Sequence, residues 1–81
     1  MVKVTIGNNV KRETVIISKD TTIRTALEEN GVSYDRGSTI LDGSTISGSD
    51  LDKTFAQLGY TGEEGHNKCY LYNVAKAANA A

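Results

Sequence analysis

The sequence predicts an α+β domain in which one helix lies across one face of a mixed β-sheet. Residues 2–6 alternate between apolar and polar side chains, as a strand with one buried face does. Residues 22–30 carry the stripe, start and stop signals of a short amphipathic helix. Residues 68–74 are dense in aromatic and β-favouring side chains, which predicts a strong final strand.

The alternating segment leads into a predicted hairpin. Gly7, Asn8 and Asn9 follow it, and these residue types tolerate the positive φ that a tight turn requires. β-favouring residues then resume over residues 10–18, so the two strands are expected to pair antiparallel. Residues 15–17 are apolar at every position, which leaves the register of the second strand open.

The helix pattern begins after a cluster of residues that can cap a helix: Asp20, Thr21 and Thr22. Its apolar stripe stands at i, i+3 and i+4: Ile23, Ala26 and Leu27. Arg24 has the spacing of a helical ion pair with Glu28. Gly31 follows Asn30 where a left-handed residue is wanted, so the helix is expected to end there after two to three turns.

Residues 37–48 predict a pair of short strands around the turn Asp42-Gly43. The apolar side chains that they are expected to add to the core are Ile40, Leu41 and Ile46. Ser49 with Asp52 three residues later resembles a capping box, and one or two helical turns are expected to follow, ending at Gly59. The apolar stripe of these turns is Leu51, Phe55 and Leu58.

Size and charge exclude several classes of protein. With 81 residues and 8.7 kDa, the chain is one small domain. Nine Lys and Arg against ten Asp and Glu leave a net charge of −1, so no nucleic-acid partner is expected. The longest apolar run, residues 15–17, is too short for a membrane span or a signal-peptide core. One cysteine and no export signal favour a cytoplasmic protein, which we expect to be monomeric.

No catalytic, cofactor or metal site is predicted. Cys69 is in phase with Leu71 in the final strand, which favours burial over a nucleophilic role. His66 is near in sequence, but a Cys/His pair also needs an orienting group and an oxyanion site, which the sequence does not indicate. The neighbouring carboxylates are interpreted as solvated or as helix-start charges. We therefore expect a protein that is not an enzyme.

The order hairpin, helix, short strands, helical turn and strand is that of the β-grasp. Over residues 1–75 the chain resembles the ubiquitin-like superfamily, and we expect one domain over that range with residues 76–81 as a flexible, Ala-rich tail. The segments 51–56 and 68–71 also look like those of small ubiquitin-like proteins carried by bacterial mobile elements. The resemblance implies that the first and last strands run parallel, side by side.

The resemblance leaves alternatives for the function. Conjugated ubiquitin-like proteins and sulfur carriers end in Gly-Gly, whereas this chain ends in Ala80-Ala81. A modifier or sulfur carrier is therefore expected only after processing. A small phage- or mobile-element inhibitor of a host enzyme is a further alternative.

The leading expectation is a non-enzymatic, ubiquitin-like adaptor or regulatory module that binds another protein through its sheet face or a strand edge. Tyr70 and Tyr72 share one face of the final strand, and Cys69 and Leu71 share the other. If the helix covers the second pair, the tyrosines face outward near residues 10–12; the reverse assignment stays open. The predicted partner-binding residues are Tyr70, Tyr72, Lys68 and Arg12, whereas Tyr34 and Tyr60 are expected to anchor loops.

Overall fold

The computed structural model describes residues 1–8, 10–35 and 37–74. It confirms the α+β class, with one α-helix and a five-stranded mixed sheet. The elements in chain order are β1 (Val2–Asn8), β2 (Arg12–Ile17), α1 (Ile23–Glu29), β3 (Ser38–Leu41), β4 (Ser44–Thr45), the 3-10 helix η1 (Gly48–Asp52) and β5 (Lys68–Val74). The expected tail over residues 76–81 lies outside the described residues.

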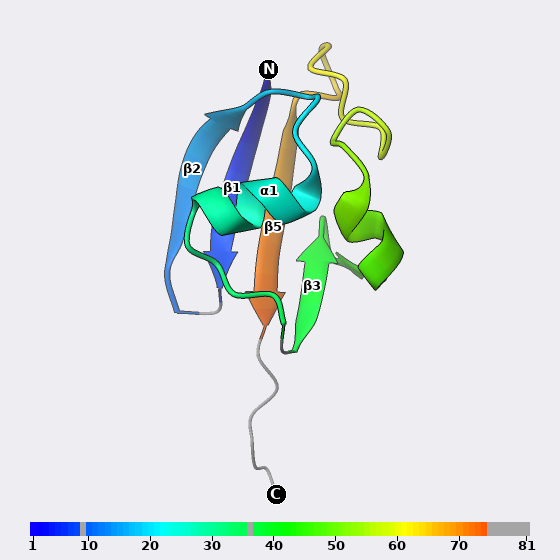
Figure 1. Cartoon of the computed structure of the whole chain (residues 1–81). Coiled ribbons are helices and arrows are strands. Elements are labelled where there is room, and N and C mark those ends of the chain that lie inside the picture. Colours follow the sequence, from blue (N-terminus) through cyan, green and yellow to red (C-terminus); the bar gives the residue numbers. More distant parts are fainter. Residues whose placement is uncertain (9, 36, 75–81) are drawn as a thin grey trace, which may run out of the picture.

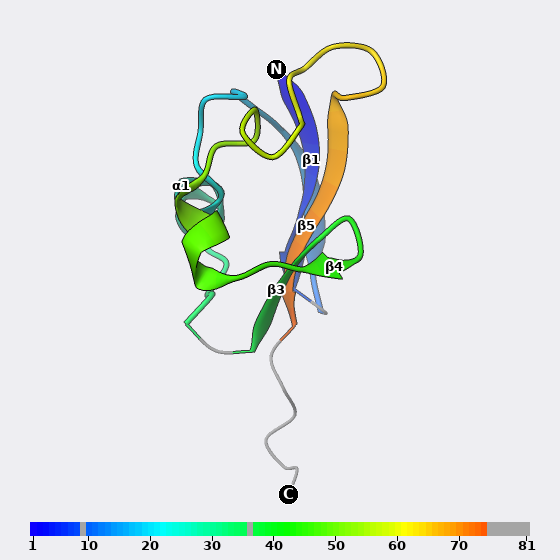
Figure 2. The same cartoon turned by 90° about the vertical axis from the view of Figure 1, so that its right-hand side faces the viewer.

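The sheet has the strand order β2-β1-β5-β3-β4, of which Figure 1 labels the first four strands and Figure 2 shows β4 beside β3. β1 pairs antiparallel with β2 and parallel with β5, and β3 pairs antiparallel with both β5 and β4. The predicted parallel contact between the first and last strands is therefore confirmed. The topology is compatible with the expected β-grasp.

Asn8 closes the first hairpin. Its side-chain oxygen accepts hydrogen bonds from the backbone N–H groups of Val10 and Lys11, both at 2.8 Å. Because the turn uses these two amides, β2 begins at Arg12, two residues later than the sequence suggested. The register that the sequence left open pairs Gly7 with Arg12 and Val2 with Ile17.

Helix α1 begins and ends close to the predicted positions. Of the three candidate caps, Thr22 is the one used, and its hydroxyl accepts a hydrogen bond from the Thr25 N–H at 3.1 Å. The predicted stripe is buried: Ile23, Ala26 and Leu27. The expected Arg24–Glu28 pair is wrong, because Arg24 reaches Asp52 of η1 at 2.9 Å. Arg24 therefore joins α1 to η1 and does not form an ion pair within the helix.

Two details of the middle segment differ from expectation. Ile40 pairs with Tyr72 on the face away from the helix and is only half-buried, whereas its neighbour Leu41 enters the core. Adjacent strand residues point to opposite faces, so both could not be buried together. The cap of η1 is Ser47 and not Ser49, and the Asp50 carboxylate accepts a hydrogen bond from the Ser47 N–H at 3.4 Å.

The predicted helical turns after Ser49 are shorter than expected. Only Gly48–Asp52 is helical, and turns continue to residue 59, where Gly59 has φ 102°. The side chains of Leu51 and Phe55 are nevertheless buried, and Leu58 is half-buried against them. The stripe was predicted correctly although the regular helix was not.

The core lies between one face of the sheet and the layer formed by α1 and η1 (Figure 2). It contains one buried polar pair, in which the Asn73 side-chain amide donates to the Thr39 hydroxyl at 3.2 Å. The opposite face of the sheet carries no helix among the described residues. Each described helix is also too short to cross a membrane.

Candidate functional site

The sheet face opposite α1, called the open face below, brings the predicted partner-binding residues together. The strand register places outward side chains in three rows across β2, β1 and β5: Ile16, Lys3 and Lys68; Thr14, Thr5 and Tyr70; Arg12, Gly7 and Tyr72. The outward positions of all five strands lie in the described part of the chain, and none of them holds Asp or Glu. The open face is therefore basic in a chain whose net charge is −1.

Tyr70 is the most prominent aromatic side chain of the open face. Its neighbours Cys69 and Leu71 are buried at 4% and 0% exposure, whereas Tyr70 is 58% exposed. This alternation settles which face carries the tyrosines, a question that the sequence left open. Ile16 lies on β2, separated from Tyr70 by strand β1, and is 57% exposed, so the face offers apolar surface at two separate places.

Tyr72 is less available than Tyr70. The Arg12 guanidinium lies over its ring, 4.2 Å from the ring centroid, and the Tyr72 side chain is half-buried. Arg12 and Tyr72 stand on strands that are separated by β1, and Gly7 occupies the position between them. Because Gly7 has no side chain, the arginine can lie across β1 to reach the ring. This stack is a cation–π contact that occupies one face of Tyr72.

Lys3 and Lys68 are direct partners in the parallel pairing of β1 and β5. The ion pairs among the described residues join Lys11 to Glu13, Lys19 to Asp20, Arg24 to Asp52 and Lys53 to Asp50. Neither Lys3 nor Lys68 takes part in them. A hollow of about 430 Å³ opens beside the two lysines, lined by Lys3, Thr5, Thr14, Asp42, Lys68, Cys69 and Tyr70.

Asp42 stands at the rim of this hollow with both carboxylate oxygens already engaged. One oxygen accepts the Tyr70 N–H at 2.8 Å, and the other accepts the Tyr60 hydroxyl. Half-burial raises the pKa of Tyr60, and the hydrogen bond to Asp42 raises it further. Tyr60 thus anchors its loop as predicted, and Asp42 serves the fold.

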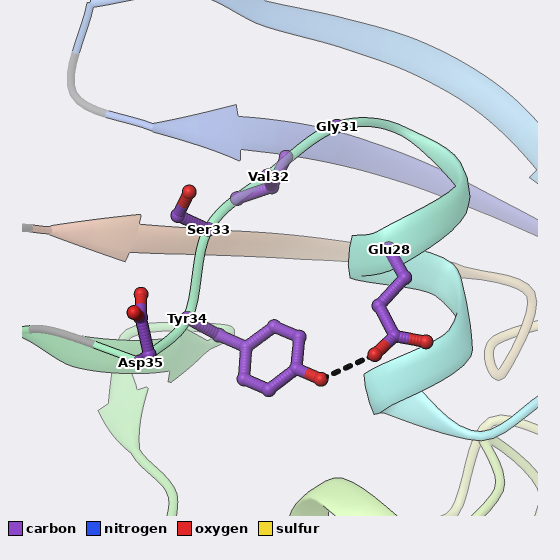
Figure 3. Close-up of a pocket in the computed structure, with 6 residues that line it drawn as sticks. All are labelled: Glu28, Gly31, Val32, Ser33, Tyr34 and Asp35. Atoms are coloured by element: carbon purple, nitrogen blue, oxygen red, sulfur yellow. Dashed lines mark hydrogen bonds between the residues drawn. The ribbon is translucent and has the colours of Figure 1, made fainter.

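A second hollow, of about 410 Å³, lies at the C-terminal end of α1 (Figure 3). The Tyr34 hydroxyl points at Glu28 and donates a hydrogen bond to its carboxylate. The Arg24 guanidinium lies 5.2 Å from the Tyr34 ring centroid, and its hydrogen bond to Asp52 raises the pKa of Arg24. These side chains tie the helix to the next loop and to η1. Tyr34 is therefore also a loop anchor, and its polar groups are used within the chain.

The possible Cys/His pair does not form a catalytic arrangement. The Cys69 side chain is in the core, where burial and then the negative charge of Asp42 raise the pKa of the thiol to about 12. His66 lies in an exposed turn, and its backbone N–H donates to the Glu63 carbonyl at 2.7 Å. Within the described residues, no three His, Cys, Asp or Glu side chains are placed to hold a metal ion.

Several residues of the open face were not predicted to lie there: Lys3, Thr5, Thr14, Ile16 and Ile40, the last of which was expected in the core. Lys3 and Thr5 had a usable signal, because they are the polar members of the alternating first strand. Ile16 and Ile40 did not, since each lies in a run where neighbouring residues are also apolar.

No protein-family model matches the chain, and neither a curated protein nor a solved structure shows significant similarity to it.

Proposed function

We propose that this chain is a β-grasp, ubiquitin-like interaction module that binds another protein through the open face of its sheet. In this proposal it is a non-enzymatic adaptor or regulator, acting as a cytoplasmic monomer. The strand order β2-β1-β5-β3-β4, with a parallel central pair and one helix crossing behind it, supports the β-grasp assignment.

The observation that carries the binding proposal is the exposure of Tyr70 on the central strand of an uncovered sheet face. Tyr70 pairs with Thr5 of β1 on one side, and on the other side it is hydrogen-bonded to Asp42 in the turn that follows β3. Tyrosine supplies a large contact area at low conformational cost and is enriched, together with arginine, among residues that dominate interface energy. Arg12, which lies over the ring of Tyr72, adds a cation to the same surface. The face thus combines an exposed aromatic anchor with a neighbouring cation.

A capture experiment with Tyr70→Ala tests the proposal. The wild-type protein and the variant are immobilised at equal density, exposed to lysate of the source cells, and the bound proteins are quantified by mass spectrometry. We expect the specific partner to be depleted about tenfold by Tyr70→Ala, as for loss of a central aromatic anchor. The thermal midpoint should change little, because more than half of the side chain is already in water.

Val10→Ala is the matched control, because Val10 is a highly exposed apolar residue in the hairpin turn and not on the open face. It should capture the partner as the wild type does. Equal capture by wild type and Tyr70→Ala, both folded, would contradict binding through this face. The ring of Tyr72 is a poorer test position, since Arg12 covers it and its loss also frees the arginine.

A further inference from the structure

Charge is distributed unevenly between the two layers of the molecule. The outward strand positions hold Lys3, Arg12 and Lys68 and no carboxylate. Asp42, in the turn after β3, is the one acidic residue at the rim of the hollow on this face, and the other acidic side chains of the described residues lie on the helices, in the loops or on the inward side of β2. We propose, as a step that rests on the proposed function, that the partner presents an acidic protein segment to the open face. Its carboxylates contact the Lys3–Lys68 pair, and an apolar side chain packs on Tyr70.

The lysine pair is the first argument for an acidic ligand. Neighbouring strands are about 4.8 Å apart, so two directly paired lysines bring like charges close together. Within the described residues no carboxylate pairs with either of them. A carboxylate placed between the two ammonium groups offsets their repulsion and gains a charge-assisted hydrogen bond from each. Two adjacent cations without a carboxylate partner in the described chain therefore favour an anionic ligand at this place.

The hollow beside the lysines supplies one free hydroxyl donor in the same place. The Thr5 and Thr14 hydroxyl oxygens are 3.2 Å apart, and only one of the two O–H groups is used in the bond between them. The other O–H remains for a ligand oxygen. Asp42, the one acidic residue at the rim, already accepts two hydrogen bonds and is fixed by them. Cations, a free donor and an exposed ring thus line one depression.

A single-stranded nucleic acid fits these features less well than an acidic peptide does. Such ligands need a series of aromatic rings on which bases stack, together with a basic groove that follows the backbone. Tyr70 offers its ring freely, but that of Tyr72 lies under Arg12. A short segment with a few carboxylates matches the size of the basic area.

A defined peptide tests this inference by NMR. The probe is a capped decapeptide of serine and glycine that carries three glutamates and one leucine, titrated into the isotope-labelled protein. Its counterpart, with glutamine in place of glutamate, is the uncharged control. We expect the amide signals of Thr5, Lys68 and Tyr70 to shift with the acidic peptide and not with the glutamine peptide. The affinity for the acidic peptide should fall about tenfold as the ionic strength rises from about 0.01 M to about 1 M, because salt screens exposed charges.

The variant Lys3→Glu/Lys68→Glu should weaken binding of the acidic peptide at least about tenfold. Lys19→Glu/Lys53→Glu changes the net charge equally away from the open face and should bind as the wild type does. Equal binding of both peptides, absence of shifts on the open face, or tighter binding of an oligothymidine would overturn the inference.

The same variants separate this inference from the function on which it rests. If Tyr70→Ala loses the captured partner while folded Lys3→Glu/Lys68→Glu retains it, the module binds through the open face but its ligand is not acidic. If Tyr70→Ala also retains the partner, the proposed function itself is wrong. Joint loss of capture in the two variants supports both statements.

Discussion

Gly7 is the residue at which the open face depends on the absence of a side chain. A Cβ at this position would lie 2.1 Å from the Lys11 carbonyl oxygen and 2.7 Å from the Arg12 Cα. Both contacts are with backbone, so the hairpin would have to open. We expect Gly7→Ala to lower the free energy of unfolding by about 2 kcal/mol, as overpacking does, and to release Arg12 from Tyr72. Urea unfolding measures the first effect and NMR of the arginine side chain the second.

Gly48→Ala is the control, because a Cβ there meets no atom within 4 Å. It should change stability by no more than about 0.5 kcal/mol. Comparable losses in the two variants would show that the close approach at Gly7 is not what restricts the position.

Single side chains were predictable where the local pattern determines their face. Lys3 alternates with Val2 and Val4, so its outward direction follows from the sequence. Arg24 was not predictable, because its spacing favours Glu28 and only the folded chain brings Asp52 closer. An ion pair between residues close in sequence, such as Arg24 with Glu28, forms at little entropic cost. It competes with partners that lie close only in the folded chain, such as Asp52.

At the scale of elements, the β3–β4 turn is joined to the central strand by Asp42. This residue has φ 50°, and its backbone N–H donates to the Tyr70 carbonyl at 2.8 Å while its carboxylate accepts the Tyr70 N–H. Asp42→Ala removes both carboxylate acceptors and leaves alanine in the left-handed region. We expect a loss of about 3 kcal/mol in the free energy of unfolding, measured by urea titration.

Asp42→Asn is the matched comparison. Asparagine tolerates positive φ and keeps a side-chain oxygen for the Tyr70 N–H, so it should cost about 1 kcal/mol or less. A loss in Asp42→Asn as large as that in Asp42→Ala would show that the negative charge, and not the turn geometry with its acceptor, stabilises this junction.

The elements themselves were predicted better than their ends. The helix and the first strand have strong periodic patterns, the last strand is dense in β-favouring residues, and all three lie where they were expected. The start of β2 was predicted two residues too early, because the Asn8 side chain accepts hydrogen bonds from the backbone N–H groups of Val10 and Lys11. The spacing of apolar residues gives no indication of such side-chain contacts. The segment after η1 was read as helix because a stripe at i, i+4 and i+7 fits a run of turns that buries the same side chains.

For the whole molecule, the resemblance to ubiquitin-like proteins implied the parallel contact of the first and last strands, which the structure has. The distribution of charge on the folded surface could not be predicted from the sequence. The net charge of −1 is the sum over the whole chain and says nothing about where the charges lie. The register of β2, β1 and β5 places three cations on one face of the sheet. Composition alone therefore indicates no electrostatic preference in a protein that has a basic face. That preference emerges only when strand pairing fixes which residues are neighbours.

The stability of the whole chain should depend on pH through the buried Cys69 thiol, because the folded and unfolded chains bind its proton with different affinity. The Cys69 thiol has a pKa of about 12 when folded, whereas a thiol in the unfolded chain ionises near ~8.5. Between these values the unfolded state binds fewer protons than the folded state, so the free energy of unfolding decreases as pH rises. At about pH 10.5 the loss from this group should be roughly 2–3 kcal/mol relative to neutral pH.

Urea unfolding at a series of alkaline pH values measures this loss, and two variants assign it. Cys69→Ala cannot ionise at this position, so its stability should fall much less steeply between about pH 8 and pH 10. The raised pKa of Tyr60 acts in the same direction at higher pH, and Tyr60→Phe removes that part. An alkaline slope that is the same in wild type and Cys69→Ala would mean that the thiol is not held neutral by the fold, and that the core around β5 admits water.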